Sequence, residues 1–296
     1  MEPMFFQMPG HMAHSARPVR PEKFPVAKAN TRQPKFSIVT PSYNQARFLP
    51  ETLRSVLEQT DVAVHYVVQD GGSSDGSADL IRKHAARLHA WTSERDAGQA
   101  DALARGFAKT SGGPADIMAW LNSDDFYLPG ALAYVADYFA IHPEVDVIYG
   151  HRIVVNEESQ EIARRFLPKH GDEVLRLNDF VPQETMFWRR RIWDQVGGLD
   201  TSFRFAMDWD LLLRFAACGA KIVRLPYFLG CFRVHSAQKT SAQMDSIGRL
   251  EIERLRKRTH GRAIPAPDLE SHPRLLRYLR RSAFIQFLWK IRVRAR

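Results

Sequence analysis

Residues 117–125, Ile-Met-Ala-Trp-Leu-Asn-Ser-Asp-Asp, place two acidic side chains directly after a short apolar run. The run predicts a buried strand that ends at Asn122. Two neighbouring carboxylates, Asp124 and Asp125, repel each other unless a cation neutralises them. Oxygen ligands on such a turn suit Mg²⁺ or Mn²⁺ carried in by a diphosphate. The alternative is a purely structural Asp-rich turn that caps the next segment. The residues alone leave both interpretations open.

Three similar units precede this stretch. Strand patterns cover residues 36–40, 62–69 and 88–93, and helical patterns follow them over 48–59, 78–88 and 98–110. This alternation predicts βαβ units, and therefore an α/β fold with a mostly parallel sheet flanked by helices. Ligands of such sheets collect at the carboxyl ends of the strands, where Asp70 and the acidic pair are expected to lie.

The turn at residues 70–77, Asp-Gly-Gly-Ser-Ser-Asp-Gly-Ser, combines glycines with short hydroxyls and two acids. It is not a phosphate-binding P-loop, because the closing Lys-Ser/Thr is missing. Carboxylates on a turn suit a ligand rich in hydrogen-bond donors, such as a uracil edge or a ribose. The alternative is a plain turn in which Asp75 or Ser77 caps the next helix.

The second half of the chain predicts a mixture of elements. Strands are expected over residues 145–150 and 152–156 around a turn, and again over 221–225 and 228–234. Helices are expected over 187–196 and 208–218, the second with an acidic first turn.

The two ends of the chain differ from its centre in composition: the first is rich in proline and the last is basic. Residues 1–34 contain six prolines without apolar periodicity, which predicts a poorly ordered arm. The net charge of +9 arises in the C-terminal stretch, since residues 247–296 hold 14 Lys and Arg against 4 Asp and Glu. We therefore expect an arm over 1–34, a catalytic domain over 35–245 and a basic helical tail over 246–296.

Four motifs together resemble the family 2 glycosyltransferases, which have the GT-A nucleotide-diphospho-sugar fold. They are Thr40-Pro-Ser-Tyr-Asn44, Asp70-Gly-Gly-Ser-Ser-Asp-Gly76, Asp96-Ala-Gly-Gln-Ala-Asp101 and Leu121-Asn-Ser-Asp-Asp125. Four later segments also fall where that family has acceptor and catalytic elements: Gln183-Glu-Thr185, Gly197-Gly-Leu-Asp200, Met207-Asp-Trp-Asp-Leu211 and Arg233-Val-His235. The resemblance covers about residues 36–240.

The resemblance implies a role for each matching residue. The nucleotide-sugar donor would be bound by Thr40, Pro41, Tyr43, Asp70, Asp96, Gly98, Asn122 and Asp124. A divalent metal, Mg²⁺ or Mn²⁺, would be bound by Asp124, Asp125 and His235. Asp208 would be the general base, and Gln183, Glu184 and Asp210 would lie near the acceptor.

The sequence departs from the family pattern at two of these positions. Asn122 stands where the family has the first acid of an acid-x-acid motif, so it can bind a ribose but adds no charge. Met207 replaces the Glu that usually precedes the base, which leaves the choice between Asp208 and Asp210 open. The Gln-x-x-Arg-Trp signature of processive synthases and their membrane spans are also missing, which disfavours that class.

The implied activity is metal-dependent, inverting transfer of a sugar from a nucleotide diphosphate to the hydroxyl of a saccharide or lipid-linked acceptor. Such transfer serves cell-surface polysaccharide or glycolipid assembly. Two alternatives stay open: a nucleotidyltransferase on a similar sheet, and a non-catalytic carbohydrate-binding or scaffolding protein with this fold.

The sequence pattern of the tail predicts a helix that either contacts a membrane or packs on the domain. Arg274, Arg277 and Arg281 share one helical stripe, and a second stripe is apolar: Leu275, Leu279, Ala283 and Phe287, with Phe284 and Trp289 beside it. Such a helix suits an anionic membrane surface. No nucleic acid partner is expected, because the rest of the chain is slightly acidic. No run of apolar residues reaches the roughly 18 that a membrane span needs, so we expect a cytoplasmic protein, peripheral at the inner face of the membrane.

Overall fold

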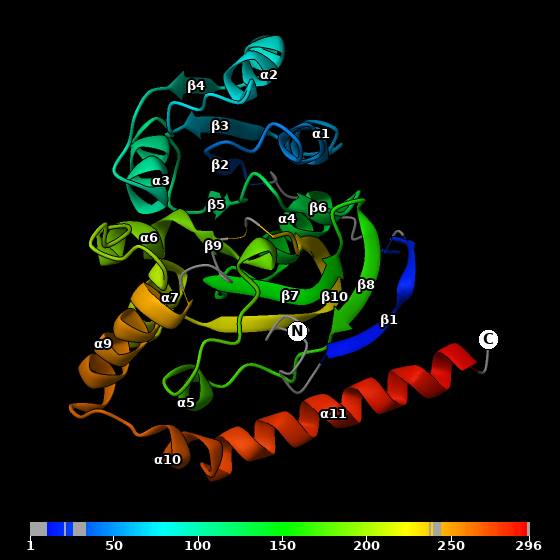
Figure 1. Cartoon of the computed structure of the whole chain (residues 1–296), viewed down its shortest axis with the longest axis vertical. Coiled ribbons are helices and arrows are strands. Elements are labelled where there is room, and N and C mark those ends of the chain that lie inside the picture. Colours follow the sequence, from blue (N-terminus) through cyan, green and yellow to red (C-terminus); the bar gives the residue numbers. More distant parts are fainter. Residues whose placement is uncertain (1–10, 21, 26–33, 237, 239–243, 295–296) are drawn as a thin grey trace.

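The computed structural model of the chain describes residues 11–20, 22–25, 34–236, 238 and 244–294. Four parallel strands form one half of its sheet: β2 (Phe36–Ser42), β3 (Val64–Asp70), β4 (Ala90–Ser93) and β5 (Ile117–Trp120). The helices α1 (Leu49–Leu57), α2 (Ser77–His84) and α3 (Gln99–Ala108) connect them, with a short 3₁₀ turn, η2 (Ala85–Arg87), after α2. These elements lie together in the upper part of Figure 1 and confirm the predicted α/β fold.

The strand β2 lies at the centre of this half, between β5 and β3. All seven of its residues are buried, which explains its apolar, β-branched sequence. The parallel register pairs Ser42 with Asp70, and Asp70 with Ser93. The ends of β2, β3 and β4 therefore present their last residues side by side at one edge of the sheet.

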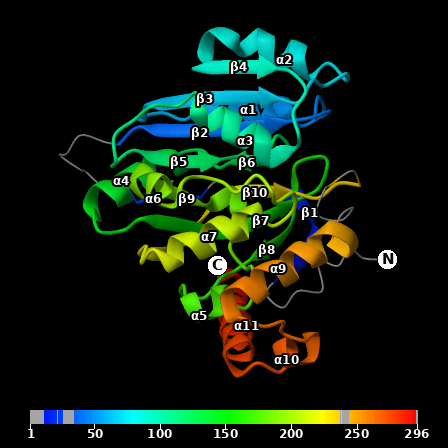
Figure 2. The same ribbon diagram turned by 90° about the vertical axis from the view of Figure 1, so that its left-hand side faces the viewer.

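The other half of the sheet is mixed. Its strands are β6 (Phe126–Tyr127), β7 (Val147–Val155), β8 (Gln160–Arg165), β9 (Phe187–Arg189) and β10 (Ile222–Arg233). They are connected by α4 (Ala131–Ile141), α5 (Asp172–Leu175), the 3₁₀ turn η3 (Gln183–Thr185), α6 (Arg190–Val196) and α7 (Met207–Ala217). β7 pairs in parallel with β10 and antiparallel with β8 and β9. β9 also pairs with β5, which joins the two halves (Figure 2).

Three predicted elements of this half differ from the structure. The strand β7 is continuous where a turn was expected after residue 150. Gly150 allows β10 to pack closely there, since a Cβ at this position would lie 2.6 Å from the Tyr227 carbonyl oxygen. The two strands expected over 221–225 and 228–234 form one strand, β10, with register shifts against β7 between Arg224 and Gly230. The helix expected over 187–196 begins only at Arg190, because residues 187–189 pair with β5 and β7.

The N-terminal arm contains a strand, so the prediction of poor order is wrong for that part. β1 (His11–Pro18) pairs antiparallel with β8 and completes the sheet order β1-β8-β7-β9-β5-β2-β3-β4, with β6 and β10 off this path. His14 and Arg17 both contact the buried carboxylate of Glu161. Backbone pairing and these charges hold β1 in place, and neither leaves an apolar pattern in the sequence. The rest of the expected arm at residues 1–10, 21 and 26–33 lies outside the described residues.

The tail consists of a π-helical turn, η4 (Met244–Gly248), and three helices, α9 (Arg249–His260), α10 (Ala266–Glu270) and α11 (Pro273–Arg294). α11 lies along the lower edge of the molecule in Figure 1. One side of α11 packs on the domain: the Tyr278 ring lies 4.7 Å from that of Phe180, and Ser282 Oγ donates a hydrogen bond to the Phe166 carbonyl (2.7 Å). Within the described ranges, no helix combines the length and apolar content that crossing a membrane requires.

Candidate active site

Asp70 organises the edge of the sheet. It is fully buried, and its carboxylate accepts hydrogen bonds from Ser73 N (2.9 Å), Ser73 Oγ (2.6 Å) and Ser93 Oγ (2.6 Å). These bonds fix the turn after β3 against the end of β4. A carboxylate offers about four acceptor positions, and hydrogen bonds from within the chain use three of those of Asp70.

The residues predicted at the end of β2 differ in how accessible they are. Thr40 and Pro41 are buried, and Thr40 Oγ1 is hydrogen-bonded to the hydroxyl of Tyr66 at 2.9 Å. Tyr43, just beyond the strand, exposes 63% of its surface. Thr40 and Pro41 therefore support the edge from inside, and Tyr43 is the member of this group that presents a ring to the outside.

Gly71 allows the turn after β3 to pack under Asp96. A Cβ at Gly71 would lie 2.8 Å from Asp96 Oδ2 and 3.3 Å from Cδ2 of Tyr43, so a side chain there would displace both. Asp96 Oδ1 also accepts a hydrogen bond from Gly98 N (2.8 Å), and Gly98 has a φ of 117° that favours glycine. The predictions named Asp96 and Gly98 but missed Gly71, although the Gly-Gly pair in the motif marked it.

Asn122 connects this edge to the next strand. Its side-chain Oδ1 accepts a hydrogen bond from Gln99 Nε2 at 2.7 Å, and Gln99 is the first residue of α3. The structure therefore brings the predicted donor residues of β2, β3 and β5 together with the start of α3.

Asp124 and His235 meet beside this edge. Their Oδ2 and Nε2 atoms are 2.9 Å apart, and the two side chains expose 17% and 3% of their surface. The ring of Phe48 packs on that of His235 at 4.7 Å. Arg233 Nε donates to the Asp124 carbonyl (2.9 Å), which attaches the end of β10 to the turn after β5.

Asp125 faces the interior. It is 2% exposed, and its Oδ1 accepts the backbone N–H of Arg233 at 2.9 Å. Burial, together with the charges of Asp124 and Glu184, raises the pKa of Asp125 well above its usual range. An enclosed carboxyl that already accepts the Arg233 N–H is poorly placed to bind a metal, so the structure separates Asp125 from the pair that it was predicted to join.

Asp124 and His235 are the two residues of this group that could hold a divalent cation. No group of three His, Cys, Asp or Glu side chains that could hold a metal occurs in the described part of the chain. Mg²⁺, however, is usually held by one or two carboxylates together with substrate phosphates, and Mn²⁺ accepts oxygen and imidazole ligands. One carboxylate and one imidazole are ligand types that such a cation accepts.

The helix α7 separates the two candidate bases. Asp208 is half-buried in the first turn, and its Oδ1 accepts the backbone N–H of Trp209 (2.9 Å). Asp210 is fully buried and forms ion pairs with Arg214 (2.7 Å) and Arg258 (2.6 Å). The acceptor contact predicted for Asp210 does not match this placement, because two arginines already occupy its carboxylate.

Gln183 and Glu184, the other predicted acceptor residues, are also buried. Gln183 Nε2 donates to the Trp120 carbonyl at 2.8 Å. Glu184 is 1% exposed and binds Arg152 through both carboxylate oxygens, at 2.8 and 2.7 Å. Both residues thus support the ends of β5 and β7 from inside.

Asp179 interacts electrostatically with Asp208, although no sequence motif marked it. It lies between α5 and η3, where burial and the nearby charge of Asp208 raise its pKa to about 8. Arg152 binds Glu184 through both carboxylate oxygens and also interacts electrostatically with Asp125 and Asp179.

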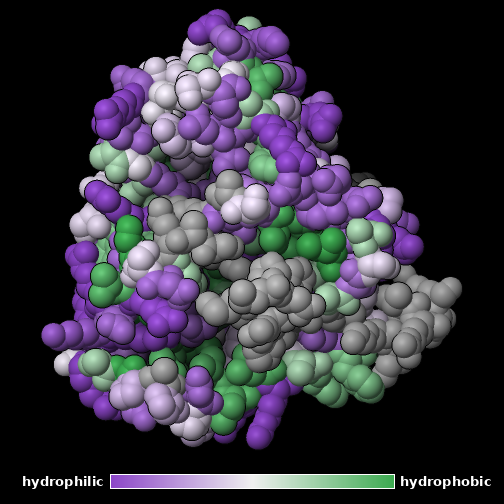
Figure 3. Space-filling view, in the orientation of Figure 1, coloured by the Kyte–Doolittle hydropathy of each residue, from purple (hydrophilic) through white to green (hydrophobic). Residues whose placement is uncertain are grey.

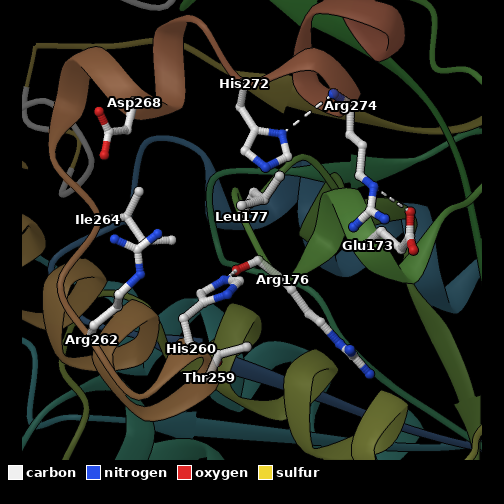
Figure 4. A pocket seen from close by; sticks show the side chains of 10 residues that line it. All are labelled: Glu173, Arg176, Leu177, Thr259, His260, Arg262, Ile264, Asp268, His272 and Arg274. Atoms are coloured by element: carbon white, nitrogen blue, oxygen red, sulfur yellow. Dashed lines mark hydrogen bonds and ion pairs between the residues drawn. The ribbon is translucent and has the colours of Figure 1, made fainter.

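A pocket of about 320 Å³ lies elsewhere, between α5, α9, α10 and α11 (Figure 4). His260 and His272 point into it from opposite walls, and Arg274 is paired there with Glu173 at 2.7 Å. None of the residues that line it is a predicted donor, metal or base residue. The pocket is therefore separate from the candidate active site.

Relatives of known sequence share the central part of this chain. O-antigen biosynthesis protein RfbC of Myxococcus xanthus is 30% identical over 197 residues, which cover 65% of this chain and 15% of that protein. The PGL/p-HBAD biosynthesis glycosyltransferase of Mycobacterium bovis is 28% identical over 195 residues, which cover 64% of this chain and 73% of that protein. The chain thus spans a small part of the first relative and most of the second.

Solved structures share the fold. The mannosyltransferase PcManGT from Pyrobaculum calidifontis, in complex with GDP-Man and Mn²⁺, superposes with a TM-score of 0.61 at 20% identity, over 88% of this chain and 75% of that one. TarS 1–349 of S. aureus, in complex with UDP-GlcNAc, superposes with a TM-score of 0.59 at 17% identity, over 80% and 69% of the two chains. The model of the family described as glycosyl transferase family 2 matches residues 37–198, more than half of the chain, and the chain therefore belongs to glycosyl transferase family 2.

Proposed function

We propose that this protein transfers a sugar from a nucleotide-diphosphate sugar to an acceptor hydroxyl. The observation that carries the proposal is the contact between Asp124 and His235 beside the strand ends that hold Asp70 and Asn122. The family supports it, as do the UDP-GlcNAc and GDP-Man complexes of proteins with this fold. The names of the relatives, O-antigen and PGL biosynthesis proteins, favour a saccharide or lipid-linked acceptor in cell-surface polysaccharide or glycolipid assembly.

In this proposal the edge of the sheet binds the donor. Asp70 accepts a hydrogen bond from the base or ribose, Tyr43 offers its ring to the nucleoside, and Asp96 covers the turn from the other side. Asp124 and His235 hold Mg²⁺ or Mn²⁺ with the diphosphate. When bound, the metal neutralises the negative charge that develops on the leaving diphosphate.

Asp208 is proposed as the general base. A hydroxyl at neutral pH is a weak nucleophile, so a carboxylate must take its proton as the oxygen attacks the anomeric carbon. Attack opposite the leaving diphosphate inverts the configuration at that carbon. The N-terminal turn of α7 holds Asp208 on an element anchored by buried residues, which fixes the direction of its carboxylate.

The free face of α11 is proposed to contact an anionic membrane surface, which would place the protein at the inner face of the membrane. Phe284, Phe287 and Leu288 are 60%, 58% and 45% exposed, and Arg277, Arg280 and Arg281 are also exposed on this helix. Figure 3 shows hydrophobic residues along the lower edge of the molecule, where α11 lies. Exposed aromatic rings beside cationic side chains match the chemistry of an anionic headgroup layer.

Part of the apolar stripe predicted for α11 packs on the domain and does not face outward. Leu275 and Leu279 pack against the domain core, and Trp289 packs on Phe166 with a ring distance of 5.2 Å. The large exposed apolar side chains of the described part of α11 are therefore limited to its second half, at Phe284, Phe287 and Leu288.

Thermal shift and turnover measurements test the transferase proposal. Nucleoside diphosphates and their sugars are screened with and without Mn²⁺, since a ligand of the native state raises its melting temperature. Sugar transfer or donor hydrolysis with release of nucleoside diphosphate supports a transferase. Nucleotide addition from a triphosphate identifies a nucleotidyltransferase, and saccharide binding without turnover identifies a non-catalytic protein; either result overturns the proposal.

A further inference from the structure

Glu251, on α9, binds the segment that leads into α7. Its side chain is 8% exposed, and its Oε1 accepts the backbone N–H of Arg204 at 2.7 Å. Its Oε2 accepts the backbone N–H groups of Phe205 and Ala206, at 2.8 and 2.9 Å. One carboxylate from the C-terminal part of the chain therefore holds three consecutive N–H groups directly before the helix that carries Asp208.

The start of α7 has no capping side chain of its own. The residue directly before the helix is Ala206, whose methyl group cannot accept a hydrogen bond. Serine, threonine, asparagine or aspartate at such a position ordinarily fixes the first turn. In this protein the fixing group comes from α9 instead, and the helix dipole of α7 favours a negative charge at this end.

Two arginines of α9 bind the same part of the chain. Arg254 Nη1 donates to Ser202 Oγ at 3.1 Å, and Arg258 forms an ion pair with Asp210 at 2.6 Å. Residues spaced by three or four positions share one face of a helix, so Glu251, Arg254 and Arg258 lie on the same face of α9. This face holds both the segment before α7 and the first turn of α7, and Figure 1 shows the two helices side by side.

The proposed base lies between two anchored positions. Ala206, two residues before Asp208, is held by Glu251. Directly after Asp208, the Trp209 Nε1 donates to the Leu175 carbonyl at 2.7 Å, and the Trp209 side chain is buried. Loss of the carboxylate of Glu251 would release the first of these anchors and let the turn that carries Asp208 shift.

Glu251 itself is not placed to react with a substrate. Its carboxylate is buried, and backbone N–H groups of the chain use three of its acceptor positions. A carboxylate offers about four such positions. An effect of Glu251 on turnover must therefore act through the residues that it holds.

We propose that Glu251 is a positioning residue, which fixes the carboxylate of Asp208 against the acceptor hydroxyl. The inference rests on the proposed function, because it takes Asp208 as the general base. A displacement of about 1 Å in a reacting group can reduce the rate by about a hundredfold. The donor is proposed to bind to other elements, at the ends of β2, β3 and β5, so loss of Glu251 should lower kcat and leave the KM for the donor unchanged.

The first experiment separates turnover from donor binding. Release of nucleoside diphosphate is measured for the full-length parent, Glu251→Gln, Glu251→Ala and Glu253→Gln, with the nucleotide sugar that the parent turns over fastest. Glu253→Gln is the matched control, because it removes an exposed acid from the same helix. Both Glu251 variants are expected to lower kcat at least about tenfold and to change the donor KM by no more than about twofold. The control should change neither constant.

Melting temperatures with and without nucleotide and Mn²⁺ show whether each variant is folded, since a folded donor site keeps the ligand-dependent rise of the parent. Glu251→Gln keeps the shape of the side chain and one of its acceptor oxygens. If that variant is not folded, Arg254→Gln takes its place, because it loosens the same segment at Ser202. A smaller fall in kcat, again without a change in the donor KM, is then expected.

The second experiment is a double-mutant cycle of Glu251→Gln and Asp208→Asn. If Glu251 acts by positioning Asp208, its substitution has little left to disturb once the carboxylate of Asp208 is gone. Glu251→Gln is therefore expected to lower the residual kcat of Asp208→Asn by about twofold at most, against at least about tenfold in the parent. A general loss of structure would lower kcat equally in both backgrounds.

Equal reductions in the two backgrounds would overturn the inference, because Glu251 would then act independently of the base. An unchanged kcat in folded Glu251→Gln would also overturn it, and both results leave the transferase proposal intact. Full activity of Asp208→Asn would remove the base assignment together with the inference, but not the transfer reaction. A parent that releases no nucleoside diphosphate from any nucleotide sugar would instead overturn the proposed function and the inference with it.

Discussion

The imidazole Nε2 of His235 lies 2.9 Å from Oδ2 of Asp124, although 111 positions separate the two residues in the sequence. Arg233, two residues before the histidine, fixes this contact by donating to the Asp124 carbonyl and to the Asp125 carboxylate. The end of β10 is thereby attached to the turn after β5. This contact unites the first half of the chain, which carries the donor motifs, with the second half, which carries the proposed base.

Asp124→Ala is expected to abolish Mn²⁺-dependent binding of the donor, because it removes the anionic ligand beside the diphosphate. His235→Ala is expected to weaken the same binding without removing it. Calorimetric titration of the nucleotide with and without Mn²⁺ measures both effects. Asp79→Ala, an exposed acid on α2, is the control. Unchanged Mn²⁺ dependence in Asp124→Ala would remove the metal assignment.

Asp208→Asn is expected to leave folding and donor binding intact but to reduce kcat by about two or more powers of ten, the scale for loss of a general base. Asp210→Asn is expected to affect stability, since it leaves Arg214 and Arg258 without their common partner; breaking a buried ion pair costs roughly 3 kcal/mol. Steady-state kinetics and urea unfolding separate the two effects. An inactive but stable Asp210→Asn beside an active Asp208→Asn would move the base to Asp210.

Asp70→Ala is expected to weaken nucleoside binding about tenfold, because a hydrogen bond to a charged group is lost. Affinity for inorganic diphosphate with Mn²⁺ should change little. Ser93→Ala is the matched control, since it removes one donor to Asp70 and keeps the carboxylate. Equal losses for nucleoside and diphosphate in Asp70→Ala would contradict its placement at the base or ribose.

The raised pKa of Asp179 predicts that the protein loses stability as the pH rises. Its pKa is raised from 3.8 to about 8 in the folded protein. The contribution of this carboxyl to stability is therefore fully present below pH 3.8 and is lost as the pH rises towards 8. The side chain of Asp179→Asn cannot ionise. The difference in melting temperature between this variant and the parent should therefore rise between pH 3.8 and about pH 8, and stay constant above that. A difference that stays constant with pH would show that Asp179 ionises normally.

Replacing Phe284 and Phe287 by serine is expected to reduce binding to vesicles that contain phosphatidylglycerol severalfold, without changing turnover of a water-soluble acceptor. Ile141→Ser, at a residue 54% exposed on α4, controls for the loss of any exposed apolar side chain. Binding by the parent should weaken with added salt, because Arg280 and Arg281 contribute electrostatically. Parent binding that is equal with and without the anionic lipid would contradict a membrane-facing role of α11.

The parallel half of the fold could be predicted from the sequence because its signals are local. Each strand, turn and helix from β2 to β5 lies within a few tens of residues, and the carboxyl ends of parallel strands must share one edge. The alternation of strands and helices therefore placed Asp70 and Asp124 at that edge, and the family resemblance added Asp96 and Asn122. The glycines at positions 71 and 98 also mark this edge. A side chain at position 71 would collide with Asp96, and the φ at position 98 favours glycine.

The motifs identify the residues that the edge of the sheet could offer to a nucleotide and a metal. Packing between distant segments then settles which of these residues face outward. Asp124 and Asp125 are adjacent in the chain, yet one meets His235 and the other is enclosed beneath Arg233. Asp179 carries no motif, and its raised pKa comes from burial and from the charge of Asp208 on another element. Burial and electrostatic neighbours are set by packing between distant segments, and packing of that kind leaves no local pattern in the sequence.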